Sequence, residues 1–120
     1  MDKSSDSILN VKSYAFAIRI VKLSQFLQKE KAEFILSKQV LRSGTAIGAM
    51  VRESEFSQST SDFIHKLSIA LKEANETDYW ISLLFDTEFV DKRLSDSLQK
   101  DCKELIALLV SSVKTLKSKK

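Results

Sequence analysis

Hydrophobic residues recur at steps of three and four along almost the whole chain, which is the spacing of amphipathic helices. Four such stretches, separated by short polar breaks, predict helices over residues 8–30, 33–56, 61–86 and 92–117. No long stretch alternates apolar and polar residues as a strand would. Because long helices joined by short connections favour antiparallel neighbours, we expect an all-α protein, an antiparallel up-and-down four-helix bundle in a single domain over residues 1–120.

Each predicted helix carries one apolar stripe that would face the core of the bundle. On the first two helices the stripes are Phe16, Ala17, Ile20, Leu23, Ser24 and Leu27, and then Leu36, Val40, Gly44, Ile47 and Val51. On the last two they are Phe63, Leu67, Ala70, Leu71, Ala74, Ile81 and Phe85, and then Leu94, Leu98, Cys102, Leu105, Leu109, Val113 and Leu116. Asp78 also falls on the third stripe, where an unpaired carboxylate would be costly to bury. Either the helix rotates locally there or the bundle opens near its end.

The first and third helices carry a second apolar face besides the core stripe. On the third helix this face comprises Ile69, Trp80, Leu83 and Leu84, beside Glu73 and Glu76. On the first helix, Val11, Ile18 and Phe26 lie among basic residues. Scattered surface hydrophobes are normal, but a four-helix monomer needs only one buried stripe per helix. The additional faces therefore favour self-association.

Composition narrows the possible chemistry. The 120 residues include two glycines and no proline, which fits few and long elements. One Cys and one His cannot form an internal disulfide or a Cys/His metal cluster, so we expect no metal and no cofactor. No run of about 18 apolar residues exists, and the start of the chain is too polar for a signal peptide. We expect a cytoplasmic protein without a membrane partner.

Charge is distributed unevenly around a net value of +3. The charged residues in 7–29 and 105–120 are all basic, whereas residues 53–104 are acidic overall. The basic stripe of the first helix comprises Lys12, Arg19, Lys22 and Lys29, and Lys117, Lys119 and Lys120 add a second basic segment. Repeated in an oligomer, this stripe would bind the phosphates of RNA or DNA. The alternative is a solvated basic face, and no interleaved aromatics or recognition helix indicate sequence-specific readout.

Both glycines, Gly44 and Gly48, lie one turn apart in the second predicted helix. Each costs about 1 kcal/mol relative to Ala in an exposed helix interior, so the pair indicates a compensating contact. The glycines flank the core stripe, while Ala46 and Ala49 lie on the far side, which makes the helix slim nearly all round. Two interpretations remain open, namely close packing inside the bundle and close approach of a neighbouring subunit. A phosphate-binding turn is a third interpretation and is disfavoured, because no Gly-Lys-Ser/Thr sequence and no preceding strand are present.

A group of charged and small residues spans the second and third helices. It comprises Arg42, Ala46, Ala49 and Glu53 on one outer stripe and Glu73 and Glu76 on the next helix. If these helices are antiparallel neighbours, Arg42 reaches Glu73 or Glu76. The pairs form either a solvated charged face worth less than about 1 kcal/mol each or a partly buried ion pair that fixes helix register or the subunit contact.

Candidate catalytic chemistry is weak. Asp62 and His65 have the carboxylate–histidine spacing of di-iron bundles, but those sites need a second such motif and further carboxylates. Glu73 and Glu76 form a carboxylate pair without a nucleophile or an orienting base. We therefore expect no active site.

The stretch from Leu41 to Leu84 resembles the four helix bundle protein family, also called the 23S rRNA-intervening sequence protein family. The resemblance rests on "RSGTAIGA" (residues 42–49), on Glu53 and Glu55 before a Ser-rich turn, and on "DFIHKLSIALKEANETDYW" (residues 62–80). One departure is Met50-Val51-Arg52, where the family more often has "NI" or "NL" and a small residue. The resemblance implies a bundle that assembles as a ring, typically a homopentamer, and no enzymatic activity. A related accessory protein of diversity-generating retroelements is similar in fold and binds nucleic acid.

Together these observations predict a non-enzymatic homo-oligomer that serves as an accessory or scaffold protein with sequence-nonspecific affinity for RNA or DNA. The alternative is a protein–protein interaction adaptor that uses the second face of the third helix and binds no nucleic acid.

Overall fold

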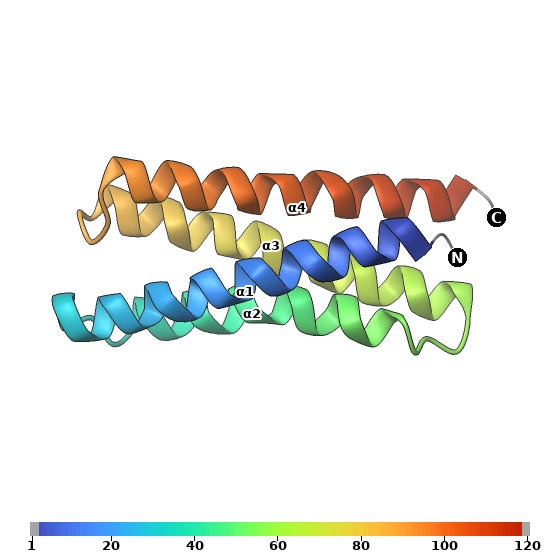
Figure 1. Ribbon diagram of the computed structural model, residues 1–120, viewed down its shortest axis with the longest axis horizontal. Coiled ribbons are helices and arrows are strands. Elements are labelled where there is room, and N and C mark those ends of the chain that lie inside the picture. Colours follow the sequence, from blue (N-terminus) through green and yellow to red (C-terminus); the bar gives the residue numbers. More distant parts are fainter. Residues whose placement is uncertain (1–2, 119–120) are drawn as a thin grey trace.

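Four helices make up the computed structural model, which describes the backbone of residues 3–118 and the side chains of residues 8–118. They are α1 (Lys3–Lys31), α2 (Leu36–Ser54), α3 (Thr60–Asp86) and α4 (Lys92–Ser118), and no strand occurs within residues 3–118. Successive helices run in opposite directions and pack side by side into a rod of 47 × 21 × 19 Å (Figure 1). The all-α class is therefore confirmed, and the arrangement is that of a four-helix bundle. Lys119 and Lys120, part of the predicted basic segment, lie outside the described residues.

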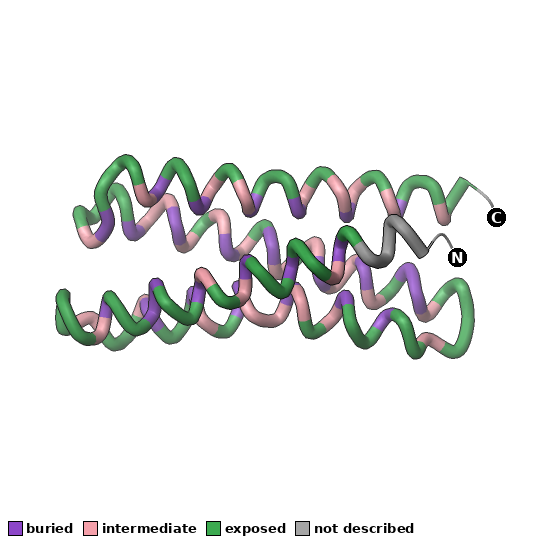
Figure 2. Tube along the Cα trace, viewed as in Figure 1, coloured by how far each residue is buried: buried purple, intermediate pink, exposed green. Residues whose placement is uncertain are grey.

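The core runs along the axis of the rod, where each helix turns one face inward (Figure 2). The predicted stripes of α2 and α4 supply much of it, including Val40, Ile47, Leu98, Leu105 and Leu109. Burying a side chain of this size stabilises the fold by about 1.5–3 kcal/mol relative to leaving it exposed. The central residues of both stripes are buried as expected, whereas Leu36, Leu94 and Leu116 near the helix ends are half-buried.

The core stripe of α3 departs from the prediction near its end. Leu84, expected on the second face, is fully buried, whereas Phe85, expected in the core, is 37% exposed. The buried residues Phe63, Ala70, Thr77 and Leu84 repeat every seven positions. A seven-residue repeat drifts by about 20° per heptad on a straight helix and is typical of helices that coil around one another. The prediction assumed a straight 3.6-residue period, and it therefore placed the end of the stripe on the wrong residue.

The same drift moves Asp78 from the predicted core stripe to the edge of α3. The side chain is half-buried, and its Oδ1 atom is shielded from solvent without a hydrogen-bond partner. The carboxylate lies close enough to Cys102 of α4 to help raise the pKa of that thiol. Asp78 is therefore a polar residue at the α3–α4 contact and not part of the central core.

The helix ends differ from the expected boundaries by a few residues. α1 begins at Lys3 and α2 begins at Leu36, where residues 8 and 33 were expected. The later start of α2 follows from Ala32, whose φ of 50° turns the chain, and from Glu33. The Glu33 carboxylate accepts hydrogen bonds from the N–H groups of Ile35 (3.2 Å) and Ser37 (2.7 Å), which satisfies donors at the helix N-terminus.

Ser59 caps the N-terminus of α3 at the α2–α3 connection. Its Oγ accepts a hydrogen bond from the N–H of Asp62 at 3.0 Å. Asp62 also places its carboxylate in the first turn of α3, where the helix dipole favours a negative charge.

None of the helices within residues 3–118 has a long enough apolar stretch to span a membrane.

Candidate interaction surfaces

The two glycines of α2 face α1 of the same chain. A Cβ atom at Gly44 would lie 2.7 Å from Cγ2 of Ile20, which is itself fully buried. A Cβ atom at Gly48 would lie 3.3 Å from the backbone oxygen of Ser13. The absence of side chains therefore lets α1 and α2 approach closely, and the contact made by the glycine pair lies inside the bundle.

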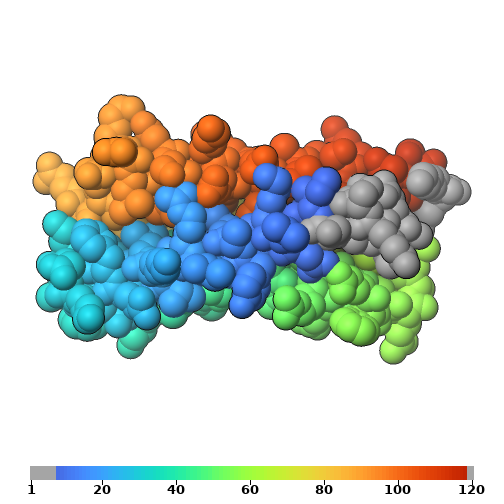
Figure 3. Space-filling model, in the orientation of Figure 1, coloured from blue at the N-terminus to red at the C-terminus, as the bar shows by residue number. Residues whose placement is uncertain are grey.

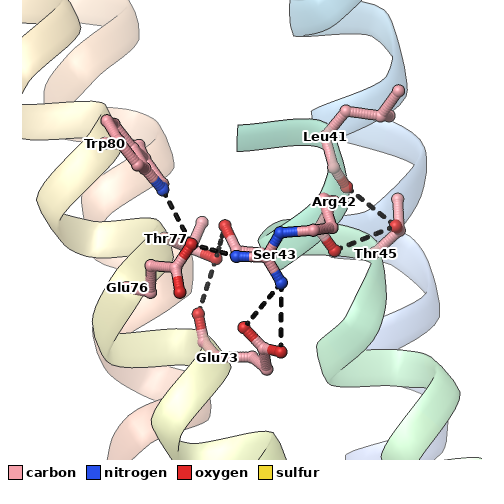
Figure 4. Close-up of polar contacts among 8 residues, drawn as sticks. All are labelled: Leu41, Arg42, Ser43, Thr45, Glu73, Glu76, Thr77 and Trp80. Carbon is pink, nitrogen blue, oxygen red and sulfur yellow. Dashed lines mark hydrogen bonds and ion pairs between the residues drawn. The ribbon is translucent and has the colours of Figure 1, made fainter. Parts of the chain in front are cut away.

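Arg42 joins α2 to α3 through two carboxylates (Figure 4). Its Nη1 lies 3.3 Å from both carboxylate oxygens of Glu73, and its Nη2 donates a hydrogen bond to Glu76. The indole N–H of Trp80 donates a second hydrogen bond to Glu76 at 3.0 Å. The Arg42 side chain is 52% exposed and that of Glu73 is 16% exposed, so the cluster is a partly shielded surface bridge between neighbouring helices.

The electrostatics of this cluster are those of mutually stabilised charges. Hydrogen bonding to Glu76 raises the pKa of the Arg42 guanidinium above its ordinary value. The hydrogen bond from Trp80, followed by that from Arg42, lowers the pKa of Glu76. Both groups are held in their charged forms, which suits a bridge and does not suit a proton-transferring acid or base.

A buried pair of hydroxyls lies beside the Arg42 bridge and had no clear signal in the sequence. The Oγ1 of Thr77 is 2.9 Å from the Oγ of Ser43 and 2.8 Å from the backbone oxygen of Glu73. Both side chains are fully buried. In the sequence, Thr77 is marked only by the seven-residue spacing of α3. Ser43 is marked only by its place directly after Arg42. The pair satisfies two polar groups between α2 and α3 and so helps to fix the register of these helices.

The remaining candidates on α2, namely Ala46, Ala49 and Glu53, lie apart from the Arg42 bridge. Ala49 and Glu53 line an open cavity of about 400 Å³ together with Tyr14 of α1 and Arg52. The guanidinium of Arg52 lies 5.6 Å from the centre of the Tyr14 ring, a cation–π contact between α1 and α2. Glu53 therefore does not join the Arg42 bridge, and Ala46 is half-buried.

The second face of α3 is smaller than the sequence suggested. Ile69, Trp80 and Leu83 are half-buried by their own bundle, and Leu84 is in the core. Trp80 packs its ring edge-on against Tyr79 at a centroid distance of 5.0 Å and is hydrogen-bonded to Glu76. Much of this face is thus used within the chain.

The first helix, in contrast, has a large apolar face in contact with solvent. We define the α1 outer face as Ile8, Val11, Tyr14, Ile18 and Val21, all of which are exposed. Val11 is 65% and Tyr14 is 58% exposed. α1 crosses the front of the molecule between α4 and α2, so this face is open along the rod (Figure 3). The sequence indicated only Val11, Ile18 and Phe26, although Ile8, Tyr14 and Val21 also fall on the outer arc of the helix.

The predicted basic stripe of α1 is divided by the packing of α4. Lys12 pairs with Glu104 at 3.2 Å, and Arg19 pairs with Asp101 at 2.7 Å. Arg19 also donates a 3.0 Å hydrogen bond to the hydroxyl of Ser97. Lys22 and Lys29 are exposed and make no ion pair among the residues that the structure describes.

Potential catalytic and metal-binding residues are not brought together. Within residues 8–118 no group of three or more His, Cys, Asp or Glu side chains could hold a metal ion. His65 is exposed, and Asp62 instead pairs with Lys66 at 3.2 Å. The single thiol, Cys102, is buried and donates a hydrogen bond to the backbone oxygen of Ala74.

The fold defines the chain as an all-α four-helix bundle. The sequence profile of the 23S rRNA-intervening sequence proteins matches residues 5–111, and the chain belongs to this family. A crystal structure of a protein of unknown function from the S23 ribosomal protein family of Bacteroides thetaiotaomicron is 52% identical and has a TM-score of 0.90. The match covers 92% of this chain and 98% of that one. A search among curated proteins finds no match. Neither description names an enzymatic reaction.

Proposed function

We propose that the protein is a non-enzymatic scaffold that self-associates through the α1 outer face. The observation that carries this proposal is the exposure of five large apolar or aromatic side chains along one helix. Soluble monomers rarely expose large contiguous apolar surfaces, and such surfaces usually mark interaction sites. The corresponding face of α3 is largely covered by its own bundle, which favours α1 as the contact.

The assembly that we propose is a closed ring, and a homopentamer is the form that the sequence resemblance implies. A ring joins one surface of each subunit to a different surface of the next, so it leaves no open edge. The cavity beside Tyr14, Ala49 and Arg52 adjoins the α1 outer face and offers a recess for side chains of a neighbour. A cytoplasmic setting is part of the proposal, because the single cysteine is used as a buried thiol.

Introducing charge into the α1 outer face tests the proposed contact. In the variant with Val11→Glu and Ile18→Glu, two exposed apolar residues become carboxylates that are costly to bury between subunits. We expect the mass in light scattering to fall to that of a single chain while the helical circular dichroism is retained. Ala107→Glu, an exposed change on α4, is the control and should leave the mass unchanged. An unchanged mass in the double variant would exclude this face as the contact.

Sequence-nonspecific binding of RNA or DNA is a second proposed function, supported by the exposed ammonium groups of Lys22 and Lys29, which make no ion pair within residues 8–118. Each copy in a ring would add its own pair, and phosphate binding tracks such repeated charge. Lys12 and Arg19 contribute less in this proposal, since each is already paired with a carboxylate of α4.

A salt titration with a generic single-stranded RNA distinguishes this function from that of an adaptor without nucleic-acid binding. We expect affinity at low salt that falls as salt rises, with a shallower dependence after Lys22→Gln and Lys29→Gln. Lys38→Gln with Lys72→Gln removes the same charge from α2 and α3 and should have a smaller effect. Absence of binding even at low salt would favour the adaptor.

A further inference from the structure

A cleft at one end of the rod has a composition that differs from that of the α1 outer face. It has a volume of about 740 Å³, and its lining residues come from the end of α1 and from the turn between α3 and α4. These two segments lie at the same end of the rod (Figure 1). Its apolar walls are Phe26, Phe85, Phe89, Val90 and Leu94. Three phenylalanines around one opening provide flat surfaces on which a planar or cationic group can stack.

Negative charge surrounds these aromatic walls. Asp86, Glu88 and Asp91 line the cleft, and Asp91 is used to cap α4 by accepting a 2.8 Å hydrogen bond from the N–H of Leu94. Asp86 and Glu88 are exposed and make no side-chain hydrogen bond or ion pair within the described residues. α3 ends here without a basic residue in its last turn, so the negative pole of its dipole adds to the two free carboxylates.

A cation of the protein itself already occupies part of this cleft. The Lys31 ammonium lies 5.9 Å from the centre of the Phe26 ring, in the range of a cation–π contact. Lys31 is the one basic residue of the lining and is itself exposed. Its position shows, independently of the carboxylates, that the aromatic wall accepts a positive charge.

We propose that this cleft binds an arginine side chain flanked by apolar residues in a partner protein. The guanidinium is planar and weakly hydrated, stacks on aromatic rings and forms paired hydrogen bonds with carboxylates. It can therefore use the phenylalanine walls and the free carboxylates of Asp86 and Glu88 at the same time. The flanking apolar residues would cover Leu94, which is half-buried in the free protein. The proposal is independent of self-association, because no residue of the α1 outer face lines the cleft.

The test uses fluorescence anisotropy of a dye-labelled peptide, acetyl-Leu-Arg-Leu, with a matched peptide in which citrulline replaces arginine. Citrulline keeps the planar shape and removes the charge, so the full-length protein should bind the arginine peptide about fivefold more tightly. Asp86→Asn with Glu88→Gln should weaken arginine-peptide binding by about the same factor. Lys31→Met should strengthen it, because the competing ammonium is removed.

The control is Glu53→Gln with Glu104→Gln, which removes two carboxylates outside the cleft and should leave arginine-peptide affinity within about twofold of the unmodified protein. All of the altered side chains are exposed, and helical circular dichroism verifies folding of each variant. Equal binding of the two peptides by the unmodified protein would overturn the proposal. So would undiminished binding by the Asp86→Asn, Glu88→Gln variant, or an equal loss in the control.

Discussion

Arg42 and Gly44 lie two positions apart on α2 and serve different neighbours. Arg42 reaches outward to the carboxylates of Glu73 and Glu76 on α3, whereas Gly44 faces Ile20 of α1. One helix thus forms a polar bridge on one side and a close apolar contact on the other. Side chains two residues apart on a helix point in different directions, so neighbouring positions can carry these separate roles.

Replacing either glycine with alanine tests the close contact between α1 and α2. Gly44→Ala should lower the free energy of unfolding by about 1–2 kcal/mol, because overpacking against Ile20 exceeds the gain in helix propensity. Gly48→Ala, whose new methyl group meets the Ser13 backbone at 3.3 Å, should change it by less than about 1 kcal/mol. Urea denaturation of both variants measures the difference. A Gly44→Ala variant as stable as the unmodified chain would contradict this packing.

Arg42→Ala tests the bridge and its dependence on pH. The loss at pH 7 should be about 1 kcal/mol, because the guanidinium is largely exposed and its ion pairs are screened by solvent. The pKa of Glu76 is lowered in the fold from its ordinary 4.5. The contribution of the Glu76 carboxylate to the free energy of unfolding is therefore present above about pH 4.5. It is lost as the pH falls through the pKa of Glu76 in the folded protein. Denaturation curves should show the difference between the two proteins shrinking as the pH falls below about 4.5, and a difference that stays constant throughout the acid range would count against the bridge.

At the scale of the helices, the sequence predicted α2 and α4 well because their apolar residues keep one regular spacing. It was less successful on α3, where Leu84 and not Phe85 completes the core, because coiling of the helices shifts the stripe over 27 residues. The Arg42 contact followed from placing α2 beside α3. The sequence did not predict the Ser43–Thr77 hydroxyl pair or the ion pairs that Lys12 and Arg19 form with α4. These contacts depend on the rotation of each helix about its axis and on the distance between helices.

The α3–α4 contact can be followed through the single thiol. Burial, reinforced by the nearby charge of Asp78, raises the pKa of Cys102 to about 12. At pH 8 the thiol is therefore protonated as well as inaccessible, and a disulfide reagent should label it very slowly in the folded protein. Labelling in increasing urea should rise together with loss of helical circular dichroism. Rapid labelling without denaturant would contradict the close packing of α3 on α4.

At the scale of the whole molecule, the rod carries distinct surfaces. The α1 outer face lies along its length, and the aromatic and acidic cleft is lined by residues of the α3–α4 turn and the end of α1. The start of α1 and the end of α4 lie at the opposite end of the rod from this turn (Figure 1). Only the first of these surfaces is a long apolar strip. It is therefore the part of the molecule on which our account of a self-associating scaffold depends.

The most direct test of that account is the native mass of the unmodified protein at micromolar concentration. Native mass spectrometry or sedimentation equilibrium compares this mass with the 13.6 kDa of one chain. We predict a single closed species of five chains that persists on dilution. A mass of one chain throughout the concentration range would contradict self-association through the α1 outer face.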